Sequence, residues 1–174
     1  FSEIEFASKY TKAKIIAVTG TNGKTTTSMI LAKILKDAGC DVLLAGNIGY
    51  SFSYALSKKD YDYVVLEVSS FQLDNIIDFK PFISVLLNIT PDHLDRYKGD
   101  FSKYINAKHK ITLNQNHNDY IIYNYDDESV RSIKTQAKKI PISLFSTLKD
   151  DAGFYKNNKI IINLNNSKMT INKL

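Results

Sequence analysis

The sequence predicts an α/β protein built on a mostly parallel sheet flanked by helices, with a small antiparallel β appendage at its C-terminal end. Short runs rich in β-branched residues alternate with longer helical stretches, which is typical of repeated βα units. The strand-like runs are almost continuously hydrophobic, which indicates a sheet covered on both faces. Two extended runs close together near the end of the chain indicate the appendage.

The buried strands of this sheet are expected at Ile15–Val18, Val42–Ala45, Tyr63–Val68, Ser84–Ile89, Tyr120–Tyr123 and Ile142–Phe145. The first helix is expected from Thr25 to Ala38, with Met29 and Ile34 on its apolar side and Gly39 as its stop. A second helix is expected from Phe101 to Leu113.

The appendage is expected beyond Gly153, where the pattern changes. Lys159–Leu164 and Lys168–Ile171 are both typical of extended strands. Asn165 and Asn166 lie between them and favour a tight turn. These runs therefore predict an antiparallel pair at the edge of the sheet.

Length and composition limit the possible functions. The chain has 174 residues, 44% hydrophobic and 24% charged, which fits one domain spanning residues 1–174. The net charge is +5, but the lysines are scattered, so we expect no nucleic-acid partner. No apolar run is long enough to cross a bilayer and no secretory leader opens the chain, so we expect a cytoplasmic protein without a membrane partner. We also expect a monomer. Cys40 is the only cysteine, which excludes an intramolecular disulfide.

The strongest chemical signal is Val-Thr-Gly-Thr-Asn-Gly-Lys-Thr-Thr, from Val18 to Thr26, between a buried strand and an amphipathic helix. Its glycines permit a tight turn with N–H groups directed at phosphate oxygens, and the helix N-terminus adds a favourable dipole. Lys24 can then reach the β and γ phosphates, and the Thr25 hydroxyl can bind Mg²⁺. Val18 stands where the common P-loop has a glycine, so the segment is a shortened variant of that loop within a P-loop-type fold. An ordinary strand-to-helix turn is the alternative interpretation.

Glu67 lies near the carboxyl end of a buried strand, at the edge where open α/β sheets bind their ligands. A charge beside Leu66 and Val68 requires compensation. A metal ion and a lysine partner both satisfy that requirement, so position alone leaves the two interpretations open.

A second polar loop follows the next strand, Asn-Ile-Thr-Pro-Asp-His-Leu-Asp-Arg-Tyr from Asn88 to Tyr97. It is expected at the same sheet edge as Gly23 and Glu67. A lone histidine such as His93 in a loop is more often a surface residue than a metal ligand. From spacing alone, Lys108 on the following helix fits a solvated charged face better than a site.

Together these motifs resemble the Mur ligases. Gly-Thr-Asn-Gly-Lys-Thr-Thr resembles the ATP loop of that family and of folylpolyglutamate synthase. Glu-Val-Ser-Ser-Phe-Gln-Leu, from Glu67 to Leu73, and the Asn88–Tyr97 segment resemble most closely the family member that adds D-glutamate. The resemblance covers the chain from about Ile15 to about Asp127 and becomes faint after Phe145.

The resemblance implies roles for individual residues. ATP would be bound by Gly20, Thr21, Asn22, Gly23, Lys24, Thr25 and Thr26. Two Mg²⁺ ions would be bound by Thr25, Glu67, His93 and Lys108, with Asp92 and Asp95 in support. The acceptor substrate would lie near Asn47, Ser69 and Gln72, and the catalytic residues would be Lys24, His93 and Lys108. Lys108 would carry a carbamate, which requires that burial or metal charge favour its neutral amine over the ordinary pKa of about 10.4.

The implied activity is that of an ADP-forming acid–amino-acid ligase of peptidoglycan synthesis. ATP would phosphorylate the L-alanine carboxylate of UDP-N-acetylmuramoyl-L-alanine, and the D-glutamate amine would attack the acyl phosphate to form an amide. Family members also have an N-terminal UDP-binding domain and a C-terminal amino-acid-binding domain, and neither is visible in the sequence. The chain begins at Phe1 without a methionine and ends at Leu174 within a strand-like stretch. We therefore expect a piece of a longer protein that is inactive alone.

Two alternatives remain open. The first is another Mur ligase or folylpolyglutamate synthase, which would depend on a different amino acid. The second is a non-catalytic nucleotide-binding module, which would bind ATP without needing Glu67, His93 or Lys108.

Overall fold

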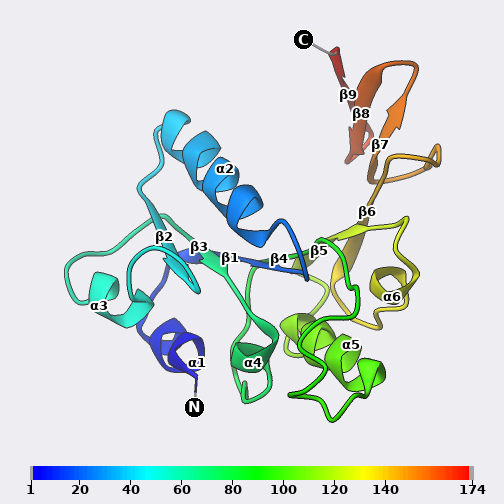
Figure 1. The fold of residues 1–174 in the computed structure, drawn as a ribbon. Coiled ribbons are helices and arrows are strands. Elements are labelled where there is room, and N and C mark those ends of the chain that lie inside the picture. Colours follow the sequence, from blue (N-terminus) through cyan, green and yellow to red (C-terminus); the bar gives the residue numbers. More distant parts are fainter. Residues whose placement is uncertain (1, 173–174) are drawn as a thin grey trace.

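The computed structural model describes residues 2–172, which form one nine-stranded sheet with helices on both faces (Figure 1). The strand order is β2-β3-β1-β4-β5-β6-β7-β8-β9. Each neighbouring pair from β2 to β7 is parallel, and the β7–β8 and β8–β9 pairs are antiparallel. The predicted fold class is therefore confirmed. Phe1 and Leu174, on which the prediction of a longer protein rested, lie outside the described residues.

The strands are β1 (Lys14–Thr19), β2 (Val42–Gly46), β3 (Tyr63–Glu67), β4 (Ile83–Leu86), β5 (Tyr120–Asn124), β6 (Lys138–Ser143), β7 (Ala152–Lys156), β8 (Lys159–Leu164) and β9 (Ser167–Asn172). The helices are α1 (Glu3–Ala7), α2 (Lys24–Asp37), α3 (Phe52–Leu56), α4 (Ser70–Leu73), α5 (Phe101–His109) and α6 (Glu128–Arg131), with 3₁₀ turns η1 (Ser8–Tyr10) and η2 (Lys110–Thr112). None of the described helices is long and apolar enough to cross a membrane.

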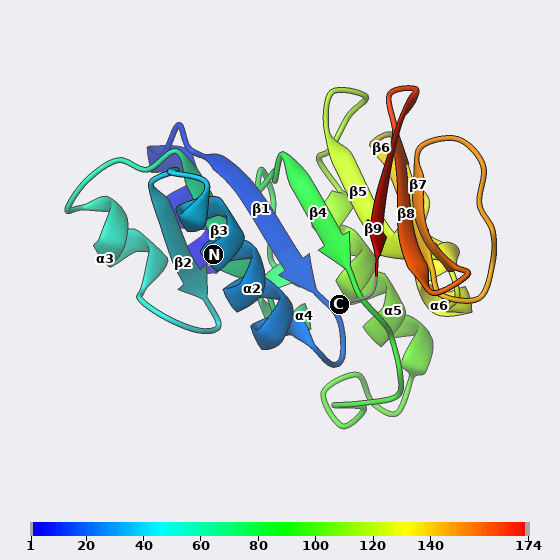
Figure 2. The same cartoon turned by 90° about the horizontal axis from the view of Figure 1, so that it is seen from above.

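The helices divide between the two faces of the sheet. In Figures 1 and 2, α2 lies alone on one face, and α1, α4, α5 and α6 lie on the other. Neighbouring residues of β3 alternate accordingly, because Val64 belongs to the core under α1 and α3, whereas Val65 packs with Ala32 of α2. A separate core under α5 and α6 includes Leu86 and Ile121. Both faces of the central strands are thus buried, as their continuous hydrophobicity predicts.

The buried side of α2 is narrower than the sequence predicts. Met29 and Ile34 are 56% and 59% exposed, so their predicted place on the buried side is wrong. Ser28 and Ala32, one turn apart, face the sheet instead. The helix packs mainly on β1, β2 and β3, and it buries a single stripe of its surface.

The strand predicted to end at Ile89 ends at Leu86. After Leu87, the chain turns toward the loop that follows β1, because the carbonyl oxygen of Asn88 accepts a hydrogen bond from the Thr21 N–H at 2.9 Å. This early end of β4 brings the second polar loop against the first.

Strand β6 begins at Lys138, earlier than predicted, and includes Pro141. The carbonyl oxygen of Ile142 accepts from the N–H of Tyr125 at 2.8 Å, so the backbone of Ile142 faces β5 and that of Pro141 faces away. On that side, pairing with β7 begins only at Ile142. Proline is tolerated here because no strand partner needs its missing N–H.

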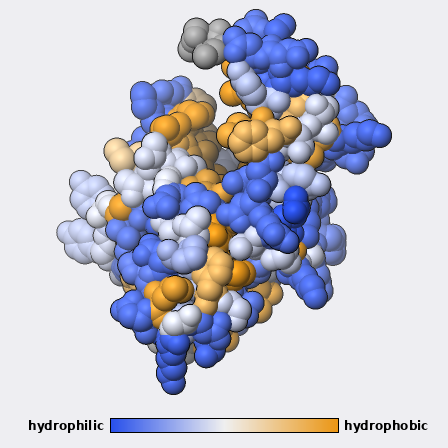
Figure 3. All heavy atoms as spheres, turned by 45° about the vertical axis from the view of Figure 1, so that its right-hand side comes forward, coloured by the Kyte–Doolittle hydropathy of each residue, from blue (hydrophilic) through white to orange (hydrophobic). Residues whose placement is uncertain are grey.

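The predicted antiparallel appendage is confirmed, with one additional strand. Asn165 and Asn166 form the turn between β8 and β9 with φ of 50° and 63°, and Asn157 and Asn158 form the preceding turn with φ of 51° and 63°. Asparagine favours these left-handed conformations, which suit two-residue hairpins. Figure 3 shows that the outer end of this appendage is mostly hydrophilic.

A crevice is expected where β1 and β4 lie side by side. From β1 the chain leaves for α2 on one side, and from β4 it leaves for α5 on the other, as Figure 2 shows. Ligands of open parallel sheets bind outside the strand ends at such a reversal.

Candidate functional site

The loop between β1 and α2 requires both of its glycines. Gly20 has a φ of 157°, and a Cβ there would lie 3.0 Å from Cβ of Leu87. Gly23 precedes α2 with a φ of 82°, in the left-handed region that glycine adopts readily. The loop therefore packs closely against the end of β4 and then turns sharply into the helix.

Only some of the loop N–H groups are available to a ligand. The N–H of Thr21 donates to the carbonyl of Asn88, and the N–H of Asn22 donates to Oδ1 of Asn88 at 2.8 Å. In the described part of the chain, the N–H groups from Gly23 to Thr26 have no partner, as is usual for the first turn of a helix. An anion at this helix N-terminus would meet those groups.

The Thr21 side chain connects three segments. Its hydroxyl donates to the carbonyl of Thr90 at 3.2 Å, accepts from the N–H of Thr90 at 3.0 Å and contacts the hydroxyl of Tyr104 at 3.2 Å. Thr21 is buried, so its side chain supports the loop from behind.

Lys24 folds over its own loop. Its Nζ donates to the carbonyl of Gly20 at 3.0 Å and to that of Thr21 at 2.8 Å. These bonds hold the ammonium group against the loop that precedes α2.

Glu67 is a buried carboxylate with neutral partners. Its side chain accepts from the Thr25 hydroxyl at 2.7 Å and from Nδ2 of Asn47 at 3.1 Å, and the residue is 2% exposed. Among residues 2–172 no lysine, arginine or histidine forms an ion pair with it, so the lysine-partner interpretation is wrong. A carboxylate and a hydroxyl side by side are the oxygen ligands that Mg²⁺ prefers.

The metal interpretation fits a partly hydrated ion. No cluster of three or more His, Cys, Asp or Glu side chains capable of holding a metal occurs within the described residues. Mg²⁺ usually keeps several waters and takes one or two carboxylates together with substrate phosphates. The Thr25–Glu67 pair beside a phosphate loop matches that second pattern.

Ser69 and Gln72 lie just beyond Glu67, at the start of α4. Oε1 of Gln72 accepts from the N–H of Ser69 at 2.9 Å, which satisfies one free donor at the helix start. The hydroxyl of Thr19 holds the preceding carbonyl, that of Val68, at 2.8 Å. Ser69 and Gln72 therefore lie at the predicted edge of the sheet, and their contact with a substrate stays a prediction.

Lys108 lies behind the glycine loop rather than on a solvated face. It is 1% exposed, and its Nζ donates to the carbonyl of Gly20 at 2.8 Å. Burial lowers the pKa of Lys108 to about 7, and the charge of Lys24 acts in the same direction against the opposing charge of Asp92. The interpretation favoured by spacing alone is therefore wrong for this lysine.

His93 is a predicted site residue whose side chain is mostly exposed. Its side chain is 70% exposed, and its Nε2 lies 3.6 Å from a carboxylate oxygen of Asp92. Its φ of 49° is in the left-handed region. Among the described residues it forms no hydrogen bond or ion pair with Lys24, Glu67 or Lys108, and its role as a metal ligand stays a prediction.

Several site residues escape the sequence reasoning. Asn88 and Tyr104 contact the glycine loop, and Asp74 accepts from Nε of Arg96 at 3.3 Å, which ties the His93 loop to the end of α4. Two signals point to them: Asn88 directly follows a buried strand, and Tyr104 precedes Lys108 by one helical turn, which puts them on one face.

Two aspartates, Asp126 and Asp127, shape the loop after β5. Asp127 caps α6 by accepting from the N–H of Val130 at 3.1 Å and also accepts from the N–H of Ile89 at 2.8 Å. Asp126 accepts from the N–H of Leu144 at 2.7 Å.

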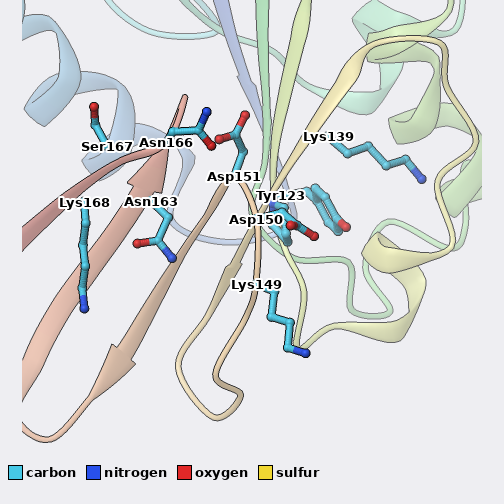
Figure 4. A pocket seen from close by; sticks show the side chains of 10 residues that line it. Tyr123, Lys139, Lys149, Asp150, Asp151, Asn163, Asn166, Ser167 and Lys168 are labelled. Carbon is cyan, nitrogen blue, oxygen red and sulfur yellow. The ribbon is translucent and has the colours of Figure 1, made fainter.

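Two hollows lie near these strands. One, of about 390 Å³, extends from Asn22 and Gly23 over an apolar part of the sheet formed by β4 to β6. Another, of about 720 Å³, lies under the appendage, and Figure 4 shows the polar side chains around it, among them Lys149, Asp150 and Lys168. The second contains none of the predicted site residues.

A glycine loop at a helix N-terminus, a lysine over it and a buried acidic residue beside it, all at the reversal point of a parallel sheet, define a P-loop-type α/β domain. The chain belongs to the Mur ligase family, because residues 18–173 match the family model described as the Mur ligase middle domain.

The chain is similar to curated proteins that share one name. The chain is 41% identical over 174 residues to the UDP-N-acetylmuramoylalanine–D-glutamate ligase of Christiangramia forsetii, covering 98% of this chain and 39% of that protein. It is 52% identical over 143 residues to the ligase of the same name from Salinibacter ruber, covering 79% and 31%. The chain thus spans about two fifths or less of the length of these curated relatives.

Solved structures support the fold. MurF ligase from Thermotoga maritima, in complex with ADP, matches 97% of this chain and 43% of its own, with a TM-score of 0.67 and 24% identity. E. coli FolC, in complex with DHPP and ADP, matches 96% and 51%, with a TM-score of 0.66 and 16% identity. At these identities the likeness concerns the fold alone.

Proposed function

We propose that this chain is the central, ATP-binding part of a longer, MurD-type ligase that joins D-glutamate to UDP-N-acetylmuramoyl-L-alanine with release of ADP. The names of the relatives at 41% and 52% identity support this substrate pair. The observation that carries the proposal is the convergence of Thr25, Glu67 and Lys108 on one loop, by bonds of 2.7 Å and 2.8 Å.

ATP is the proposed nucleotide. The four free N–H groups from Gly23 to Thr26, together with the Lys24 ammonium group, offer donors to a polyphosphate. The two solved structures named above are described as ADP complexes, which supports the same ligand class. Three predicted loop residues remain. Thr21 and Asn22 would act through the shape of the loop, because their N–H groups are already bonded, and Gly20 through its close packing against Leu87.

Mg²⁺ is the proposed metal, and Thr25 and Glu67 would hold the first ion. A bound Mg²⁺ would neutralise charge on the transferring phosphoryl group. A second ion would involve His93 and a carbamate on Lys108. The neutral amine of Lys108 would attack CO₂, forming an N–C bond and releasing a proton, and its lowered pKa favours that neutral form. Because His93 is exposed, its loop would have to close inward to take part.

The catalytic contribution of this chain would be positioning and charge neutralisation. Lys24 would stabilise charge on the phosphoryl group during its transfer to the L-alanine carboxylate. Asn47, Ser69 and Gln72, around the buried end of β3, would line the acceptor side. The amine of D-glutamate would then displace phosphate from the acyl phosphate to form the amide, and no protein nucleophile is required.

The test is an ADP-release assay on the full-length protein that contains this chain. We expect release to require both UDP-N-acetylmuramoyl-L-alanine and D-glutamate, and residues 1–174 alone to show none. Release driven by another amino acid would instead favour a different member of the family. ATP binding with no turnover under any amino acid would favour the non-catalytic module.

A further inference from the structure

Asn88, at the end of β4, binds the tip of the glycine loop through both ends of its carboxamide. Its Oδ1 accepts from the N–H of Asn22 at 2.8 Å, and its Nδ2 donates to the carbonyl of Asn22 at 3.0 Å. Its own carbonyl accepts from the N–H of Thr21 at 2.9 Å. An asparagine pairs with an N–H and a carbonyl at once only in this orientation, because a flipped amide would set donor against donor.

The bond to the Asn22 carbonyl fixes a donor on the opposite side of the same peptide. The carbonyl of Asn22 and the N–H of Gly23 belong to one planar unit, and the described chain contains no cis peptide. In a trans peptide the C=O and the N–H point in opposite directions. Holding the carbonyl toward Asn88 therefore turns the Gly23 N–H away from Asn88, and this N–H is one of the four free donors of the loop.

Asn88 is itself held firmly from both sides. The N–H of Leu87 donates to the carbonyl of Thr19 at 3.0 Å, and the N–H of Ile89 donates to Asp127 at 2.8 Å. Its carboxamide thus stands on a backbone fixed by β1 and by the loop after β5. Asn88 is partly exposed, so its bonds to the loop, rather than core packing, distinguish it.

We infer that Asn88 is a positioning residue that aims the Gly23 N–H at the nucleotide phosphates and so sets the affinity of the site for the phosphate part of its ligand. This inference rests on the proposed function of the loop. The inference adds Asn88, a residue that follows β4, to the residues of the site. The shape of the phosphate loop would then depend on β4 as well as on the glycines of the loop.

The test measures binding of Mg²⁺–ADP and of adenosine to the full-length protein by calorimetry. Asn88→Ala removes both carboxamide bonds, and Asn88→Asp keeps the acceptor but loses the donor to the Asn22 carbonyl. We expect both variants to bind ADP about tenfold or more weakly, on the scale of a hydrogen bond to a charged group, while adenosine affinity changes less than about twofold. Asn114→Ala is the matched control, because Asn114 also bonds backbone carbonyls, those of Ile77 and Phe79 at 2.8 Å and 3.1 Å, away from the loop.

The outcomes separate the two levels of the proposal. A loss confined to ADP in the Asn88 variants supports the positioning role. Unchanged ADP affinity, or an equal loss for ADP and adenosine, overturns it. Thermal melting without nucleotide identifies a variant that fails to fold, in which case the other Asn88 variant decides. If the unsubstituted protein binds no Mg²⁺–ADP, the proposed function itself fails.

Discussion

Nζ of Lys108 donates a 2.8 Å hydrogen bond to the carbonyl oxygen of Gly20, although 88 positions separate the two residues in the chain. One turn earlier on the same helix, the hydroxyl of Tyr104 contacts that of Thr21. Two side chains of α5 therefore contact the glycine loop, and the buried ammonium group of Lys108 donates its hydrogen bond to that loop.

Lys108 is expected to take up CO₂ at neutral pH. Because its pKa is lowered to about 7, its neutral fraction is large above that pH and falls as the pH drops below it. In ¹³C NMR with labelled bicarbonate we expect a carbamate signal that weakens below pH 7 and is absent in Lys108→Ala. Lys103→Ala, an exposed lysine on the same helix, should keep it. A signal that survives in Lys108→Ala would contradict the prediction.

Lys24 is expected to contribute most of the charge that meets a nucleotide. Lys24→Ala should lower the affinity for Mg²⁺–ADP by about tenfold to a hundredfold, because a charge-assisted hydrogen bond contributes about 1.5–3 kcal/mol. Lys33→Ala is the control, since Lys33 lies on the same helix in an exposed pair with Asp37. Calorimetry measures both, and equal affinities for the two variants would refute the prediction.

Glu67→Gln separates stability from function. No ion pair within the described residues depends on Glu67, so the free energy of unfolding without Mg²⁺ should change by no more than about 1 kcal/mol. The Mg²⁺ dependence of ADP binding should nevertheless be lost, because the charge that binds the ion is gone. Urea denaturation and calorimetry test the two parts, with the exposed Glu128→Gln as control. A large loss of stability would contradict the first part, because it would show that the charge of Glu67 itself stabilises the fold.

Gly46 is expected to tolerate no side chain. A Cβ there would lie 2.2 Å from the carbonyl oxygen of Glu67, at a φ of 99°. Gly46→Ala should destabilise the protein by about 3 kcal/mol or more, since backbone must shift in addition to the strain at positive φ. Gly39→Ala, also at positive φ but with nothing within 4 Å, should lose about 1 kcal/mol. Similar losses in chemical denaturation would contradict the steric argument.

Glu5 is expected to give the fold an acid-sensitive anchor. It is fully buried, and burial alone would raise its pKa, but the N–H groups of Ile77, Asp78 and Phe79 together outweigh burial and lower it. Its stabilisation is therefore complete above the ordinary pKa of 4.5 and is lost as the pH falls through the lower folded value. Glu5→Gln should lose about 2 kcal/mol at pH 7, and the difference should shrink in acid. A gap independent of pH would refute this account.

The loops of the site are predictable from sequence because each follows a hydrophobic run and carries glycine or polar residues. The same reasoning places Glu67 at a strand end, where the structure has it. It does not reveal that Asn47 and Thr25 share that carboxylate, because hydrogen-bond partners depend on how strands far apart in sequence are ordered. The motif alone likewise leaves the exposure of His93 open.

Other features lie beyond local pattern. Helices α1, α3, α4 and α6 have four or five residues each, too few for a helical period to appear in the sequence. Lys108 is buried where the backbone of Gly20 approaches it, which is a tertiary contact. The charged residues near Lys108 in the sequence do not indicate this contact. Met29 and Ile34 are exposed because only the side of α2 that carries Ser28 and Ala32 packs on the sheet.

Because β1 lies between β3 and β4, its loop is synthesised well before the partners that shape it. A nascent chain that has left the ribosome only as far as β3 lacks Asn88, Tyr104 and Lys108, and its glycine loop has nothing on one side. The glycine loop can make all of these contacts only after α5 emerges, since they join residues far apart in the chain. We therefore expect these loop contacts to form late in folding, and a truncated product that ends before α5 to lack the contacts from Tyr104 and Lys108.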